Sequence, residues 1–123
     1  MIPEGILAAA AEDGISTALV TGLGGVREVR LGRYDPAAKK YEEKAFKEQL
    51  ELTSLVGNVT AKDGAPFLHA HGTLGGRDWS VVGEHVMSAV VFPLLESVLT
   101  PTDNDAVREL DESLGLYTIR KAP

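Results

Sequence analysis

Residues 65–87, APFLHAHGTLGGRDWSVVGEHVM, alternate between apolar and polar positions on both sides of a glycine-rich segment. Alternation is typical of β-strands, because successive side chains of a strand point to opposite faces of the sheet. Residues 75–78, Gly-Gly-Arg-Asp, interrupt the pattern with turn-forming residues. The stretch therefore predicts an antiparallel hairpin with a turn near residue 77.

All three histidines of the chain lie in this predicted hairpin. His69 and His71 are two residues apart on one strand and therefore face the same side. A mirror about residue 77 pairs His69 with His85 and His71 with Gly83, which places three imidazoles together. Such a cluster can converge on a divalent metal at about 2.0 to 2.1 Å and leaves one position of a tetrahedral zinc ion open.

The residues alone leave a second interpretation open, in which the histidines are half-buried groups bonded to backbone carbonyls. The chain has no cysteine, so a transition metal must be held by histidine and carboxylate. Glu84 points to the face opposite His85. Glu51, on another predicted strand, is a better candidate for a fourth ligand, for a partner that orients a ligand, or for a general base.

The rest of the chain predicts one α+β domain over residues 1–123, mainly antiparallel sheet with a helix near each end. Pro3 and Gly14 bracket an alanine-rich segment that predicts the first helix. The acidic start of residues 103–115 predicts the second. Strands are expected at 15–23 and 26–34, joined by the glycines at 22–25, and at 40–46, 51–61, 65–74 and 79–99.

The charge, the composition and the motifs of the chain argue against several classes of function. The net charge of −6 disfavours sequence-independent grip on nucleic acid, which depends on Lys and Arg. The segment 22–25, GLGG, is followed by a strand rather than a helix, so it is a bend and not a phosphate loop. No serine lies in a nucleophile motif. No apolar stretch is long enough to cross a membrane, and the lack of cysteine fits a cytoplasmic protein.

The run from Ala89 to Leu95 is apolar at nearly every position, whereas a strand of a small antiparallel sheet usually keeps one polar face. Burial of each large apolar side chain is worth about 1.5 to 3 kcal/mol. The run therefore indicates either a central strand covered on both sides or a surface for self-association.

These segments together resemble the PPC (plants and prokaryotes conserved) domain. The similarity covers residues 4 to 120 and rests on TGLGGVREVRLGRYD, on ELTSLVGNVT with its Ser-Leu-x-Gly-Asn pattern, on the Leu-His-x-His of FLHAHGTL, and on GEHVMSAVV. The resemblance implies a homotrimer packed through its sheets. It also implies that His69, His71 and His85 correspond to the recurring histidines of the family, which hold a divalent metal.

Three functions follow as hypotheses. The first is a cytoplasmic homotrimeric module that carries a metal, zinc above all, and acts through protein or small-molecule contacts. The second is a metal-dependent enzyme acting on a small molecule. The third is DNA association, which plant members owe to an attached Arg-Gly-Arg-Pro hook; this chain lacks that sequence, so we expect no DNA binding by the chain alone.

Overall fold

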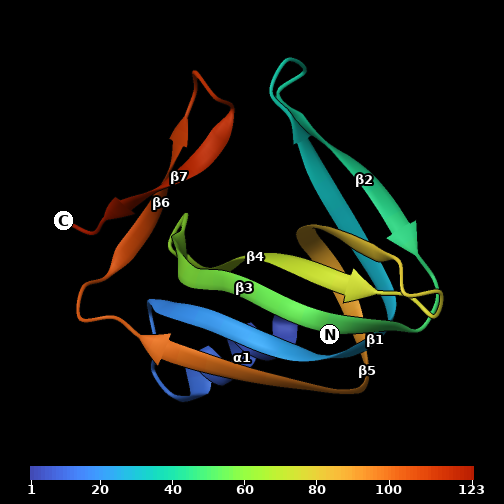
Figure 1. Cartoon of the computed structure of the whole chain (residues 1–123). Coiled ribbons are helices and arrows are strands. Elements are labelled where there is room, and N and C mark those ends of the chain that lie inside the picture. The colour runs from blue at the N-terminus through green and yellow to red at the C-terminus, as the bar shows by residue number, and fades with distance from the viewer.

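One seven-stranded sheet, in the order β2-β1-β5-β4-β3-β6-β7, contains every strand of the chain (Figure 1). The computed structural model describes residues 1–123. Most neighbours are antiparallel, as the sequence predicts, and only β3 and β6 pair in parallel. The elements are α1 (Glu4–Glu12), β1 (Ala18–Asp35), β2 (Lys40–Phe46), β3 (Leu50–Lys62), β4 (Ala65–Gly75), β5 (Val81–Pro101), β6 (Ala106–Asp111) and β7 (Leu116–Lys121).

The sheet closes on itself, because β1 pairs with β3 as well as with β2 and β5. The ring β1-β5-β4-β3 is made possible by the length of β1, which the sequence predicted as two strands joined at the glycines. It is instead one bent strand of 18 residues with a bulge between Gly22 and Gly24. At Gly24 φ is +157°, and a Cβ there would lie 2.3 Å from the carbonyl oxygen of Leu94, so only glycine fits the bend.

The hydrophobic core fills the inside of this ring and extends to α1. Leu55 of β3 and Leu74 of β4 are fully buried within it. The helix adds Ile6 and Ala10, spaced so that both face the sheet. It ends before Gly14, whose φ of +66° suits a helix terminus, so the predicted first helix is confirmed. No helix in the structure combines the length and apolar character that a membrane crossing requires.

The predicted second helix is wrong, because residues 106–121 form the β6–β7 hairpin. The Asp111 carboxylate accepts hydrogen bonds from the backbone N–H groups of Ser113 and Leu114, which shapes the turn. Gly115 follows with a φ of +69°. The acidic residues expected to start a helix lie in a bend, where the Asp105 carboxylate accepts a hydrogen bond from the Ser16 hydroxyl. Tertiary contacts therefore override the local preference for helix.

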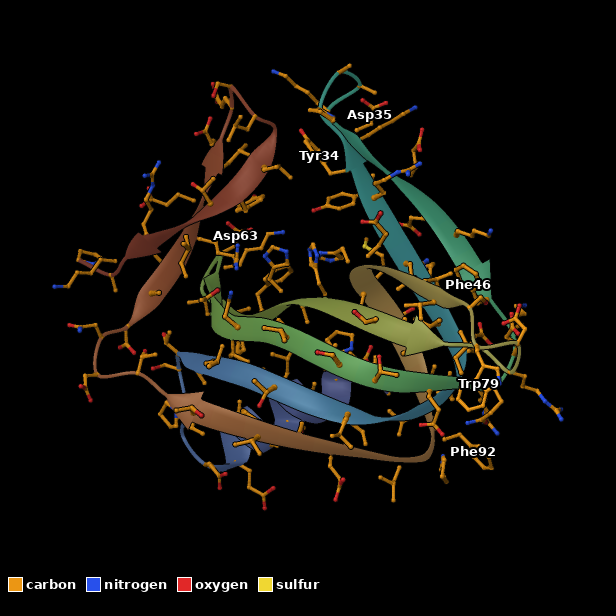
Figure 2. All side chains as sticks on the ribbon, viewed as in Figure 1. Tyr34, Asp35, Phe46, Asp63, Trp79 and Phe92 are labelled. Carbon is orange, nitrogen blue, oxygen red and sulfur yellow. The ribbon has the colours of Figure 1, made fainter.

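Two hairpins, β1–β2 and β6–β7, rise on either side of β4 (Figure 1). Their tips are in contact: the Tyr34 hydroxyl donates a hydrogen bond to the carbonyl of Leu114. The Lys39 ammonium lies 3.4 Å from the Glu112 carbonyl oxygen. In Figure 2, Tyr34 and Asp35 mark the tip of the first hairpin, while Trp79 lies at the far end of the molecule. The two hairpins thus enclose the space above β4.

Candidate metal centre

The structure brings the three histidines together, although not in the predicted register. His69 and His71 lie on β4 and His85 lies on β5. The paired residues are His71 with His85 and Thr73 with Gly83, a shift of two from the prediction. A shift of two leaves every side chain on its original face, because the period of a strand is two. The three histidines therefore lie together in the observed register as they do in the predicted one.

The shift comes from the loop between β4 and β5, which is longer than the predicted turn. Gly76 N donates to the Ser80 carbonyl, and Trp79 N donates to the Gly76 carbonyl. The Asp78 carboxylate accepts from both the backbone N–H and the hydroxyl of Ser80. Trp79 has a φ of +66° and is 92% exposed. The loop thus spans residues 76–80 and moves the centre of the hairpin to residue 78.

The imidazole rings are mutual neighbours on the outer face of the sheet. Ring centroids are 5.3 Å apart for His69 and His71, 5.0 Å for His69 and His85, and 5.6 Å for His71 and His85. One nitrogen from each ring lies within 4.8 Å of the others. Ligands of a tetrahedral ion with bonds of about 2.0 to 2.1 Å are about 3.4 Å apart, so modest rotation of the side chains is enough to close the set.

A buried polar atom in the cluster lacks a partner. Nδ1 of His85 is inaccessible to solvent and makes no hydrogen bond, whereas buried nitrogens of native proteins are nearly always satisfied. A metal ion or a hydrogen-bond donor would satisfy the lone pair of this nitrogen. Three imidazole nitrogens are a donor set that suits zinc, copper, nickel or iron. The residues present therefore fit a transition metal.

Burial and nearby positive charge favour the neutral form of two of the rings, His69 and His85, and the neutral ring is the form that binds a metal. The pKa of His69 is lowered to about 4, first because burial disfavours the charged ring, and then because His85, Arg108 and His71 repel a proton. Burial also lowers the pKa of His85, with further contributions from His71 and Arg108. Both rings are thus unprotonated at neutral pH.

The lowered pKa of His69 predicts an acid-sensitive fold in the metal-free protein. In the unfolded chain the ring binds a proton as the pH falls below about 6.5, but the folded chain does so only near 4. The free energy of unfolding should therefore decrease between these values. A shift of this size is worth about 3 kcal/mol for a shielded group, and solvent screening of the half-buried ring leaves about 1 to 2 kcal/mol.

Urea unfolding of the chelator-treated chain at about pH 7 and about pH 4.5 measures this loss. Carboxylates also titrate in this range, so the comparison is with His69→Gln, which cannot take up the proton. We expect the variant to lose less stability on acidification than the wild type. Equal losses in the two proteins would contradict the assignment.

A cavity of about 420 Å³ adjoins the histidines. It is lined by His69 and His85 at the sheet, by Tyr41 of β2, and by Tyr117 and Leu116 of β7. The Tyr41 ring lies 5.3 Å from the His85 ring. The size falls in the range of small-molecule sites, and the two hairpins supply opposite walls.

Glu51 is the one predicted site residue that the structure does not bring to the cluster. It is exposed on β3, where it pairs with Gly25 and Gly75. Val56, the β3 residue opposite His71, lies five positions further along the strand. Five residues of β-strand span about 17 Å, so the carboxylate is too far away to contact these rings.

Arg108 is the site residue that the sequence interpretation missed. Its Nη2 lies 3.3 Å from Nδ1 of His69 and donates at 2.7 Å to the side-chain oxygen of Asn58. Burial lowers the pKa of this guanidinium below its ordinary value, yet arginine stays charged at neutral pH. Gly115 was a signal for a turn in the hairpin that carries Arg108, and the acidic start of residues 103–115 concealed that signal.

The sequence matches, over residues 1–103, the model of the family described as the Plants and Prokaryotes Conserved (PCC) domain, abbreviated PPC above. No curated protein matches the chain. The match ends before the β6–β7 hairpin, so Arg108 lies outside the matched region.

Three solved structures share the fold. A metal-containing protein of Archaeoglobus fulgidus is 38% identical, with a TM-score of 0.87 over 95% of this chain and 83% of that one. A PPC protein of Pyrococcus horikoshii is 31% identical, with a TM-score of 0.89 over 98% and 83%. A protein of Bacteroides thetaiotaomicron that has been proposed to bind DNA is 30% identical, with a TM-score of 0.91 over 97% and 83%.

Proposed function

This chain belongs to the Plants and Prokaryotes Conserved domain family, and from this premise we propose that His69, His71 and His85 hold one divalent metal ion. The observation that carries the proposal is the convergence of three imidazole nitrogens within 4.8 Å. The unsatisfied Nδ1 of His85 supports it. The Archaeoglobus relative, a metal-containing protein, adds support from the comparison.

Zinc is the ion that we favour. Imidazole nitrogens suit zinc, and three of them leave one tetrahedral position open, which is the arrangement of reactive rather than structural zinc sites. In such a site zinc supplies Lewis acidity toward a bound water or carbonyl group. The role of the chain is to hold three imidazole rings on one rigid face and to provide the adjoining cavity.

Elemental analysis of protein purified without a histidine tag tests the proposal, followed by titration of the chelator-treated chain with zinc and with cobalt. We expect one ion per chain and, for cobalt, the visible absorption of a four- or five-coordinate ion. A chain that binds neither ion at stoichiometric concentration would remove the site.

A homotrimer, the assembly that the family resemblance implies, is the one that we propose, and exposed apolar side chains on the outer face of the sheet support association between copies. Leu19, Leu23, Val56 and Val98 are each between 47% and 63% exposed. Val56 and Val98 both pair with Thr21 of β1, so the band runs across three adjacent strands. A contiguous apolar patch on a sheet favours association with other copies.

Val98→Glu is expected to convert the trimer to monomers, because each interface would then bury an unpaired carboxylate at a cost of several kcal/mol. The matched control is Val81→Glu, since Val81 lies on the same strand and both valines are 63% exposed. Light scattering should give about three times the chain mass of 13.1 kDa for the wild type and the control. A wild-type mass equal to one chain would refute the trimer.

DNA binding by this chain alone is not part of the proposal. Two of its clustered arginines already have acidic partners: Arg30 lies 3.2 Å from Glu43, and Arg33 lies 3.6 Å from Glu42. With a net charge of −6, little positive surface is left for a phosphate backbone.

Metal-dependent chemistry on a small molecule is the second candidate function, and the cavity beside His69 and His85 favours it. A module that acts only through assembly has no need of such a cavity. We place either activity in the cytoplasm, since the chain has no cysteine.

A further inference from the structure

Arg108 is buried without an acidic partner. Only 8% of the residue is exposed. Its Nε donates to the Thr60 hydroxyl at 3.1 Å, and its Nη1 donates to the Tyr117 carbonyl at 3.2 Å. Both are neutral acceptors, as are Asn58 and His69 on Nη2. The ion pairs of the structure lie between β1 and β2, away from this residue. A buried guanidinium is costly unless an anion compensates it.

The hydrogen bonds of Arg108 leave one donor free. A guanidinium carries five N–H groups, and the four contacts described above use four of them. The remaining N–H belongs to Nη1. Arg108 also lines the cavity beside the histidines, so its charge and this donor are within reach of a molecule bound there.

The lining of the cavity is cationic. Lys62 and Arg108 are its charged residues, and no Asp or Glu contributes to it. This is unusual in a chain with 18 acidic and 12 basic residues. The Lys62 ammonium is held over the Tyr117 ring at 4.0 Å and the Phe67 ring at 4.8 Å, at the wall of the cavity. An anion entering the cavity meets two positive charges and no negative one.

Most of the remaining lining is apolar. Leu7 of α1, Met87 of β5 and Leu116 of β7 line the cavity together with the rings of Phe67 and Tyr117. Such walls give an inorganic ion nothing to contact, but they match the hydrocarbon or aromatic body of a small organic acid. The guanidinium matches the acid group, because its planar N–H groups suit a carboxylate.

The contact between Arg108 and His69 links this anion site to the metal. A neutral imidazole has one nitrogen with a free lone pair and one that carries hydrogen. While Nδ1 of His69 accepts from Arg108, the lone pair is not available to a metal at either nitrogen. Coordination by His69 therefore ends this hydrogen bond and releases an Nη2 N–H of Arg108.

We propose that the cavity binds a small organic carboxylate, with the acid group held by Arg108 and Lys62, and that binding is stronger when the three histidines carry a metal. The second half of this proposal rests on the metal site proposed above, whereas the carboxylate site does not. The two ligands should favour each other, since coordination adds positive charge and frees a donor for the acid.

Benzoate is the probe and benzamide is its control, because the two have the same shape and differ in charge. Calorimetry on the metal-loaded chain of residues 1–123 should show benzoate binding at least about tenfold more tightly than benzamide. Removing the metal should lower the affinity for benzoate about fivefold or more. Equal affinity for the two probes, or no benzoate binding to loaded protein, would overturn the proposal.

Arg108→Met should lower the affinity for benzoate at least about tenfold. Arg120 is exposed on the same hairpin. The variant Arg120→Met removes the same charge and should bind benzoate as tightly as the wild type does. Should Arg108→Met fail to fold, Lys62→Met serves in its place, with a loss of about threefold or more. Zinc titration of each variant keeps the two proposals apart: lost benzoate binding with intact zinc binding in Arg108→Met supports the carboxylate site, whereas a chain that binds benzoate but no zinc refutes the metal site alone. Unchanged benzoate binding in Arg108→Met and Lys62→Met refutes the carboxylate site.

Discussion

His85→Ala should lower the affinity for zinc by about 100- to 1000-fold. Zinc binding by a four-ligand site is worth about 10 to 16 kcal/mol, or about 3 to 4 kcal/mol per ligand, and each 1.4 kcal/mol is a factor of ten. His69→Ala and His71→Ala should lose similar amounts, because the three nitrogens are members of one set. Competition titrations against a chromophoric chelator measure the affinities.

Thr73→Ala is the matched control for these variants. Thr73 lies on β4, two residues beyond His71 and on the same face, and like His71 it is exposed. Its loss should change zinc affinity by less than about threefold. Circular dichroism of each metal-free variant checks the fold. Retention of full affinity by any of the histidine variants would show that this residue is not a ligand.

Gly57→Ala should destabilise the fold and disturb the metal site without touching a ligand. A Cβ at residue 57 would lie 2.2 Å from the His69 carbonyl oxygen and 2.7 Å from the Ala70 Cβ. The obstacle includes backbone, so β3 and β4 must move apart. Overpacking of this kind costs about 1 to 3 kcal/mol. Because His69 moves with β4, we also expect zinc affinity to fall at least about tenfold.

Thermal unfolding and zinc titration of the same sample measure both effects of Gly57→Ala. Gly75→Ala is the control, since a Cβ there meets nothing closer than the Thr53 Cγ2 at 3.7 Å. The control should unfold within a few degrees of the wild type and bind zinc as tightly. A Gly57→Ala chain as stable as the control would contradict the close approach of β3 and β4.

The sequence was sufficient to predict the elements whose signal is local. Alternation identified β3, β4 and the first half of β5, and the Pro3 to Gly14 segment identified α1. The three-histidine cluster followed from the same alternation, because a register shift of two residues leaves each side chain on the same face of the sheet.

Features that depend on contacts between distant residues were missed. The closure of the ring through β1 and β3 joins segments about 30 residues apart, and no local pattern specifies it. The β6–β7 hairpin is anchored by Arg108 on Thr60, 48 residues earlier in the chain, and the acidic residues before it suggested a helix. Arg108 became visible as a site residue only once that hairpin was in place.

The closed ring of strands also limits how copies of this chain can add to one another. Because β1 pairs with β3, the outermost strands β2 and β7 are the two ends of the sheet that still offer backbone groups to a new strand. Lysine and glutamate occupy four of the seven positions of β2, namely Lys40, Glu42, Glu43 and Lys44, and β7 ends in Arg120-Lys121. Charged edges resist the strand-by-strand growth that produces fibrils, so association through the sheet face can end in a closed particle and stay soluble.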